Sequence, residues 1–205
     1  IKTAQCGIGP ITRFDAAEVD SRVAGEVKDF DAARFMDRKE ARRMALFSQY
    51  AVAAARMAHE HAELPESLDT SRCAVVFGNG IGGNEVDSDS HKRMVERGPG
   101  RIPPMSIPKV IVNEAAGNIS MALQFQGPVL TVVTACASGT DAIGNAMDMI
   151  RSGRADVVAT GGTEACVTPY SIGGFAALKA LSTNFNDAPE KASRPFDKDR
   201  DGFVM

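Results

Sequence analysis

A run of β-branched residues that ends near a cysteine constrains the fold of this chain more than any other feature. Residues 129–134 read Val-Leu-Thr-Val-Val-Thr, which is typical of a buried strand, and Cys136 follows two positions later. Residues 141–152 then have helical periodicity. One stripe of that helix is formed by Ile143, Met147 and Ile150. The sequence therefore predicts that Cys136 lies where a strand turns into a helix.

This position favours a nucleophilic thiol. Backbone N–H groups without helical partners and the positive end of the helix dipole meet at a helix N-terminus, and both stabilise a thiolate. The alternative is a small, buried and unreactive cysteine, which is the commonest state of a free cysteine. Position alone favours neither interpretation of Cys136.

A second strand follows the predicted helix. Gly153 is suited to end the helix, and residues 155–160, Ala-Asp-Val-Val-Ala-Thr, have the pattern of the next strand. Strand, helix and strand in this order form a parallel crossover unit. We therefore expect an α/β fold with a mostly parallel sheet that helices cover on both faces, and a site at the carboxyl ends of its strands.

Composition narrows the classes of protein. The 205 residues are 44% hydrophobic and 24% charged, and no linker divides them, so we expect one compact domain over residues 1–205. No apolar run has the length of a membrane span, and a net charge of -3 argues against a nucleic-acid partner. The four cysteines and three histidines show no zinc-ligand spacing, which predicts no metal, reduced thiols and a cytoplasmic location.

A long helix is expected in the first third of the chain. Asp37-Arg38-Lys39-Glu40 has the form of a capping box, and apolar residues recur at helical spacing from there to about Ala62. Its first turns place three basic side chains on one face, Lys39, Arg42 and Arg43. Taken alone, such a charged face is most often simply solvated.

The segment Gly78-Asn79-Gly80-Ile81-Gly82-Gly83 satisfies the GxGxxG pattern of dinucleotide-binding proteins. That pattern should open into an apolar helix, whereas residues 84–91 are strongly polar and residues 99–108 read as a proline-rich loop. We therefore favour close backbone packing beside Cys136 as the role of these glycines. A nucleotide-binding protein that uses Gly78–Gly83 stays as the alternative of another class.

Several spaced motifs together resemble one enzyme family. Thr134-Ala135-Cys136-Ala137-Ser138-Gly139 is similar to the nucleophile motif of the β-ketoacyl-acyl-carrier-protein synthases, the thiolase-fold condensing enzymes of fatty-acid synthesis. Further segments resemble the elongating type II pattern in the same order: Gly78–Gly83, Ile111–Asn113, Gly127-Pro128, Gly161–Glu164, Gly173–Phe175, Ala180–Thr183, Ser193–Asp197 and Arg200–Val204. The resemblance runs from about Ile11 to the last residue.

The resemblance implies a reaction and a nucleophile. The family elongates fatty acids by decarboxylative Claisen condensation of an acyl-enzyme thioester with malonyl-acyl-carrier protein, which gives 3-oxoacyl-carrier protein. Cys136 would be the catalytic nucleophile, with its own backbone N–H as one oxyanion donor. The resemblance further implies a thiolase-like N-terminal half, a homodimer, no metal and no organic cofactor.

It also implies roles for residues beyond the nucleophile. Within a predicted helix over residues 111–123, Ile111 would line the acyl pocket of the neighbouring subunit, and Phe175, at a Gly-Gly-Phe corner, would lie at the acyl tunnel. The strand before Cys136 would lie at the dimer interface. Docking of the acidic acyl carrier protein would involve Lys39, Arg42, Arg43 and Lys179. Plain core packing is the alternative for Ile111 and Phe175.

The family comparison also predicts that the sequence is incomplete at both ends. The family's first βα unit and its second half, which carries two catalytic histidines, would be absent. None of His59, His61 and His91 stands in a segment that matches those motifs. We therefore expect no condensation from this chain alone, and exposed apolar surface on helices such as 141–152.

Two alternatives lie close to this family. A polyketide ketosynthase would use the same chemistry, and adjoining acyltransferase or carrier modules in the gene would distinguish it. A non-catalytic partner of the chain-length-factor type would lack the cysteine that is present at position 136.

Overall fold

The computed structural model describes residues 3–205 and divides them into two compact units. The larger unit is Asp31–Ala165, and the smaller one joins the described residues up to Phe30 with Cys166–Met205. Each unit is considered by itself below. The expected single domain over residues 1–205 stays a prediction.

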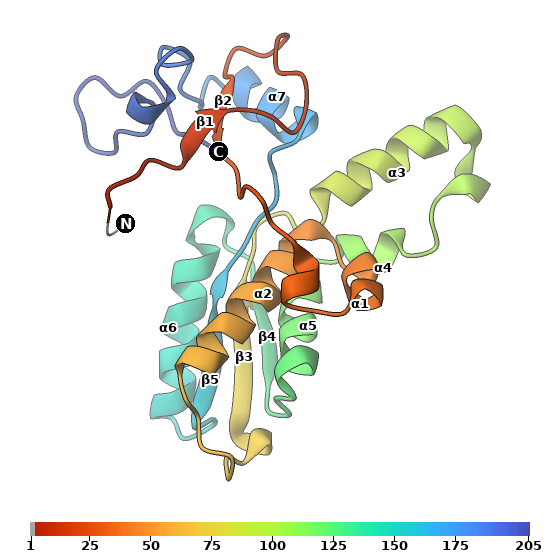
Figure 1. Cartoon of the computed structure of the whole chain (residues 1–205), viewed down its shortest axis with the longest axis vertical. Helices are drawn as coiled ribbons and strands as arrows, with labels where there is room; N and C mark the ends of the chain where they lie inside the picture. The colour runs from red at the N-terminus through yellow and green to blue at the C-terminus, as the bar shows by residue number, and fades with distance from the viewer. Residues whose placement is uncertain (1–2) are drawn as a thin grey trace. The chain divides into compact units, whose positions relative to one another are not determined.

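The larger unit is built on a parallel sheet of three strands, β3 (Cys73–Gly78), β4 (Val129–Val132) and β5 (Val157–Gly162). The strand order is β4-β3-β5, with both neighbours of β3 parallel to it (Figure 1). The register places Gly78 opposite Val132 on one side and Gly162 on the other. The expected α/β fold is confirmed, and so are the strands expected within residues 129–134 and 155–160.

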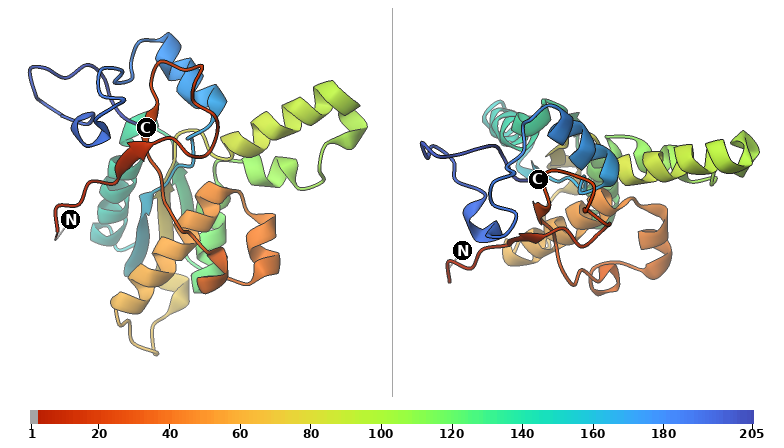
Figure 2. Two further views of the ribbon diagram at one scale, coloured as in Figure 1. Left: turned by 45° about the horizontal axis from the view of Figure 1, so that its top comes forward. Right: turned by 90° about the horizontal axis from the view of Figure 1, so that it is seen from above.

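Helices cover both faces of this sheet. The helix α6 (Ser138–Arg151) packs on one face, whereas α5 (Glu114–Leu123) and α2 (Leu46–His61) cover the other (Figures 1 and 2). The central strand β3 is buried along its whole length, as expected for a parallel strand with both faces covered. On the α6 face the packed core comprises Ala74, Val76, Ala142, Ala146, Met149 and Ala155.

The helix α6 starts three residues before the predicted 141 and turns its small side chains toward the sheet. Its apolar stripe of Ile143, Met147 and Ile150 remains exposed, with exposed fractions of 55%, 45% and 47%. The expected exposed apolar surface on this helix is therefore confirmed.

The long helix predicted from Asp37 to Ala62 is wrong in one respect, because the chain breaks it in two. Asp37 caps α1 (Arg38–Arg43) as predicted, but Ala45 is extended and α2 starts only at Leu46. The Gln49 side chain donates to the backbone oxygens of Ala41 and Met44, at 2.9 and 3.2 Å. Glu85 accepts from the Leu46 N–H at 2.9 Å. These tertiary hydrogen bonds satisfy the helix ends at the break.

Two further predictions between β3 and β4 need correction. The polar residues after Gly83, for which no element was predicted, form a helix, α3 (Asn84–Arg97). The proline-rich stretch, expected to be a loop, contains a helix, α4 (Ser106–Val110). Pro108 is tolerated because it lies in the first turn of α4, where its missing N–H costs little. Residues 111–113 connect α4 to α5, so the helix predicted over 111–123 begins at Glu114.

Short 3₁₀ turns complete the chain: η1 (Ala32–Arg34), η2 (Thr70–Arg72), η3 (Pro99–Arg101), η4 (Ala135–Ala137) and η5 (Pro189–Lys191).

The smaller unit joins the two ends of the chain. Here β1 (Ile8–Pro10) pairs antiparallel with β2 (Val23–Gly25). The expected Gly-Gly-Phe corner is instead part of a helix, α7 (Pro169–Ala177), which the Thr168 side chain caps. The core of this unit comprises Ile11, Ala24, Ile172 and Leu181.

No helix among residues 3–205 combines the length and apolar character needed to cross a bilayer. All four cysteines are free thiols.

An ion pair joins the amino-terminal ends of β3 and β5. Arg72 donates from Nε and Nη2 to the two carboxylate oxygens of Asp156, each at 2.6 Å, and from Nη2 to the Gly153 backbone oxygen at 3.1 Å. The hydrogen bonds from Arg72 hold the pKa of the Asp156 carboxyl below its ordinary value. A carboxyl group with a lowered folded-state pKa stabilises the fold above its unfolded pKa and loses this contribution as pH falls through the folded value.

We therefore predict a pH-dependent effect of Asp156→Asn. The variant should unfold at a lower temperature than the wild type near pH 7, and the difference should shrink as pH falls below the ordinary carboxyl pKa of 3.8. Thermal unfolding of both proteins across this pH range measures it. Asp89→Asn, on the exposed side of α3, is the matched control and should show no such convergence. A deficit that stays constant with pH would contradict the prediction.

Candidate functional site

Three segments meet at the carboxyl edge of the parallel sheet. Residues 79–83, here called the glycine loop, follow β3, and residues 133–138, here called the cysteine turn, follow β4. Thr163 and Glu164 follow β5. The shared register brings all three together, because Gly78, Val132 and Gly162 lie side by side.

The cysteine turn packs directly on the end of β3. A Cβ atom at Gly78 would overlap the backbone carbonyl of Ser138, so only glycine allows this approach. The turn forms η4 and then passes into α6, which places Cys136 immediately before the helix, as predicted. The Cys136 side chain is exposed. The expected role of the glycines in close packing is confirmed at Gly78.

The buried hydroxyl of Ser138 fixes the shape of the cysteine turn. It accepts from the Thr134 N–H at 2.9 Å, and its own O–H faces the backbone oxygens of Ala135 at 2.6 Å and Asn79 at 3.3 Å. Ala135 has a φ of 53°, in the left-handed region that an L-residue with a Cβ adopts at a cost. The turn that presents the thiol is therefore strained and held by its neighbours.

Glu164 lies in the site, although the sequence patterns predict no role for it beyond its place in the segment Gly161–Glu164. Its Oε2 accepts from the N–H groups of Gly80 and Ile81, at 2.7 and 3.1 Å, and its Oε1 accepts from Gly82 at 3.3 Å. Desolvation raises the pKa of Glu164 above its ordinary value, and these three hydrogen bonds offset part of that rise. One sequence signal could have predicted this contact: an acidic residue and a glycine loop both follow strands that are expected to be parallel.

The backbone beside Ile111 adjoins the other side of the glycine loop. Gly83 donates its N–H to the Val110 oxygen at 3.3 Å, and Asn79 donates from Nδ2 to the Val112 oxygen at 2.6 Å. The Ile111 side chain itself is 45% exposed. Core packing does not account for Ile111 in this chain, and its role at an acyl pocket stays a prediction.

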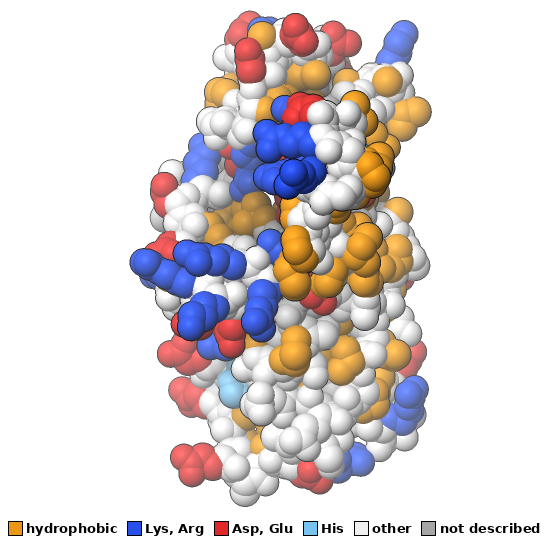
Figure 3. Space-filling view, turned by 90° about the vertical axis from the view of Figure 1, so that its right-hand side faces the viewer, with side chains coloured by type: hydrophobic (Ala, Val, Ile, Leu, Met, Phe, Trp, Pro, Cys, Tyr) orange, Lys and Arg blue, Asp and Glu red, His pale blue; other side chains and the backbone are white. Residues whose placement is uncertain are grey.

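The basic residues expected to bind a carrier protein are exposed. Lys39, Arg42 and Arg43 lie on α1, and Lys and Arg side chains form groups on the face that carries this helix (Figure 3).

Phe175 and Lys179 belong to the smaller unit, apart from the unit that holds Cys136. Phe175 contacts Phe203 edge to face, with ring centroids 5.3 Å apart, and Lys179 is exposed after α7. Phe175 thus has a packing role within its unit, and its tunnel role stays a prediction.

The other cysteines and the histidines lie elsewhere. Cys73 and Cys166 are buried, and burial raises the pKa of the Cys73 thiol, whereas Cys6 is exposed near the start of the chain. His59 contacts the Phe125 ring edge to face at 5.8 Å, and His91 lies 3.4 Å from the Asp87 carboxylate on α3. Among the described side chains, no group of three or more His, Cys, Asp or Glu could hold a metal ion.

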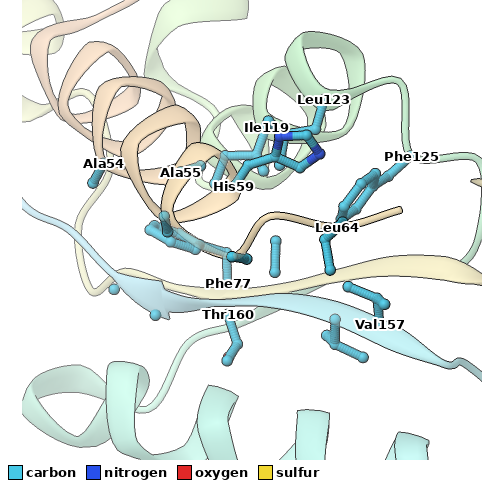
Figure 4. A pocket seen from close by; sticks show the side chains of 16 residues that line it. Ala54, Ala55, His59, Leu64, Phe77, Ile119, Leu123, Phe125, Val157 and Thr160 are labelled. Carbon is cyan, nitrogen blue, oxygen red and sulfur yellow. The ribbon is translucent and has the colours of Figure 1, made fainter. Parts of the chain in front are cut away.

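An apolar cavity of about 420 Å³ lies between α2, α5 and the sheet (Figure 4). Its walls include Phe77, Ile119, Phe125 and Val157, and His59 lies at one side. Cys136 does not line it, and His59 is the only ionisable side chain among its described lining residues. The cavity therefore lacks a pair of groups for proton transfer, and the candidate site stays at the carboxyl edge.

Comparison with known proteins agrees with this geometry. The sequence matches the family described as "Beta-ketoacyl synthase, N-terminal domain" over residues 1–205. The chain belongs to the β-ketoacyl synthase family. It is 50% identical to the 3-oxoacyl-[acyl-carrier-protein] synthase 2 of Synechocystis over 97% of its own length and 48% of that protein. It thus spans about half the length of the curated relatives it matches.

Solved structures of other β-ketoacyl synthases share the fold. The ishigamide ketosynthase/chain length factor matches with a TM-score of 0.87 and 32% identity, over 98% of this chain and 48% of that chain. The AntDE:AntF complex, a type II polyketide acyl-carrier protein with its ketosynthase, matches with a TM-score of 0.72 and 25% identity, over 78% of this chain and 47% of that one. The fold prediction, a thiolase-like N-terminal half, is thereby confirmed.

The structure also bears on the nucleotide-binding alternative. A dinucleotide phosphate would need the N–H groups of the glycine loop, but those of Gly80, Ile81 and Gly82 already donate to Glu164. The Glu164 carboxylate would repel a phosphate bound at the same N–H groups. The glycine loop is thus filled from within the protein, which argues against a nucleotide site.

We predict that Cys136 is the cysteine alkylated fastest near neutral pH. It is exposed at the start of α6, where the backbone N–H groups of the first helical turn attract negative charge, whereas Cys73 and Cys166 are buried. Peptide mapping after limited treatment with iodoacetamide measures the order of labelling. Cys6 is an internal control, because it is exposed but lies on no helix. Labelling of Cys6 before Cys136 would contradict the prediction.

Proposed function

We propose that this chain is the N-terminal half of a 3-oxoacyl-acyl-carrier-protein synthase of the elongating type II kind. The observation that carries the proposal is an exposed thiol on a fixed turn between a parallel strand and a helix. Identity is 45–50% to synthases named for acyl-carrier-protein substrates, and 25% to the type II polyketide complex above. The higher identity favours fatty-acid elongation over polyketide synthesis.

The first chemical step is acyl transfer to Cys136. The thiolate attacks the carbonyl carbon of an acyl-carrier thioester, the new C–S bond forms, and the carrier thiolate leaves and takes up a proton. The backbone N–H of Cys136 is the proposed donor to the oxyanion of the tetrahedral intermediate. In the second step malonyl-carrier loses CO₂, and its carbanion attacks the acyl-enzyme, which releases the Cys136 thiol and forms 3-oxoacyl-carrier.

The second step calls for groups beyond those at this site. The residues around the cysteine turn supply backbone donors, a serine hydroxyl and the engaged carboxylate of Glu164. The histidines lie on α2 and α3, where His59 contacts Phe125 and His91 contacts Asp87. We infer that the groups that promote decarboxylation come from a further part of the protein, which would also cover the exposed stripe of α6.

The proposed homodimer would form at β4. This strand is at the edge of the sheet and exposes Val129 and Leu130, and Val133, directly after it, is exposed as well. Open backbone groups with apolar side chains on an edge strand favour pairing with another chain. A second copy of the same strand is the proposed occupant.

Acylation of Cys136 tests the proposed function. The full-length natural protein should be incubated with a carrier protein that holds an acyl chain as a thioester. It should gain one acyl group on the peptide that contains Cys136, and the Cys136→Ala variant should gain none. Cys6→Ala is the matched control and should acylate normally. With malonyl-carrier the full-length protein should give 3-oxoacyl product, whereas residues 1–205 alone should give none. An acylated Cys136→Ala protein, or condensation by the 205-residue chain, would contradict the proposal.

Charge reversal tests the proposed carrier-docking face. Changing Lys39, Arg42 and Arg43 to Glu in the full-length protein should raise the KM for acyl-carrier substrates by about tenfold or more and weaken its salt dependence, because the carrier is acidic. Carrier-free thioesters should react unchanged. Reversal of the exposed Arg151 and Arg154 serves as the control. Equal losses on both kinds of substrate would indicate a folding defect and refute the docking role.

A further inference from the structure

We propose that Glu164 is a positioning residue for the reaction at Cys136, acting through the glycine loop. This inference rests on the proposed function, in which Cys136 is the nucleophile. Glu164 itself contacts neither the thiol nor a substrate in the described contacts. Its role follows from a chain of bonded segments at the carboxyl edge of the sheet.

The first link is the carboxylate of Glu164 on three successive backbone N–H groups. Such a row of converging N–H groups forms a concavity that binds an anion, and Glu164 occupies it at 2.7, 3.1 and 3.3 Å. The loop thereby gains a covalently attached anion from the end of β5. Without it, three N–H groups would need other partners, and the loop could take other conformations.

Gly80 shows how closely the carboxylate and the loop fit. A Cβ atom at this position would lie 2.8 Å from Oε2 of Glu164 and 3.8 Å from the backbone of Ala135. A side chain at this position would therefore have to displace the carboxylate of Glu164 and would also lie beside the cysteine turn.

The second link joins the glycine loop to the cysteine turn. The Asn79 backbone oxygen faces the Ser138 hydroxyl at 3.3 Å, and the Asn79 N–H donates to the Val132 oxygen at 3.2 Å. Ser138 in turn bonds the consecutive residues Thr134 and Ala135, which precede Cys136 in the turn. The strained φ of Ala135 persists only if these neighbours hold it. Loosening the loop would therefore let the turn relax and move the thiol.

Displacement of the thiol would lower the reaction rate more than the affinity of the protein for its substrate. A small displacement of a nucleophile from the carbonyl carbon strongly lowers the rate of attack. A shift of 1 Å lowers the rate by about 100-fold. The carrier would still dock on its own surface. A change in kcat with an unchanged KM is the signature of this positioning role.

The test compares Glu164→Ala, Glu164→Gln and Gly80→Ala in the full-length natural protein. Glu164→Ala should slow alkylation of Cys136 by about threefold or more and its acylation at saturating acyl-carrier by about tenfold or more, with KM for the carrier within about twofold. Glu164→Gln should recover most of the rate, because its amide oxygen still accepts from the loop. Glu66→Gln, on an exposed loop, is the control and should behave as wild type.

Gly80→Ala provides an independent arm, because it displaces the carboxylate without removing it. It should reproduce the loss seen in Glu164→Ala, and the double variant should be no slower than either single variant. Wild-type rates in Glu164→Ala, or an undiminished effect of Gly80→Ala when Glu164 is already Ala, would overturn the proposal. If Glu164→Ala does not fold, the Gly80→Ala variant decides the question by itself. Wild-type rates in a folded Gly80→Ala protein would then overturn the proposal.

The two proposals fail in different ways. If unaltered protein does not acylate Cys136, the proposed function is wrong. The alkylation rates of the variants still decide the positioning role of Glu164, because the reaction with iodoacetamide depends on the place of the thiol beside the first turn of α6 and needs no acyl-carrier substrate.

Discussion

The parallel register of three short strands is the constraint on which the site depends. Gly78 lies opposite Val132 and Gly162, so the segments that leave these strands start side by side. At the end of β3 the chain has no room for a side chain, because the backbone of Ser138 occupies it. Position, approach and orientation of the cysteine turn all follow from this packing. A shift of one strand by one residue would separate the glycine loop, the turn and Glu164.

Sequence patterns predicted the features that are local. The β-branched run before Cys136, the strands around it and the helix cap at Asp37 depend on neighbouring residues, and each was found where expected. The break between α1 and α2 was not predicted, because apolar spacing continues across it. It depends on Gln49 and on Glu85, a residue 39 positions beyond Leu46, and no local pattern contains such a contact.

The candidate site divides in the same way. The location of Cys136 could be predicted, since strand, cysteine and helix are adjacent in the sequence. Glu164 and Ser138 could not be given roles, because their partners depend on the register and on backbone atoms that every residue has. Phe175 and Lys179 were named from the family resemblance, and they lie in the smaller unit, so the contacts of the larger unit say nothing about them. Their roles stay predictions.

The hydrogen bond between Glu85 and Leu46 has a consequence for the carrier protein. It ties the start of α2, directly after the basic helix α1, to the first turn of α3, which begins at the glycine loop. The proposed docking helix and the thiol thus belong to one bonded frame. A carrier docked on α1 would face a fixed span to Cys136. The distance between the carrier surface and its thioester, and not a movement between α1 and the cysteine turn, would then decide whether the thioester arrives at the sulfur.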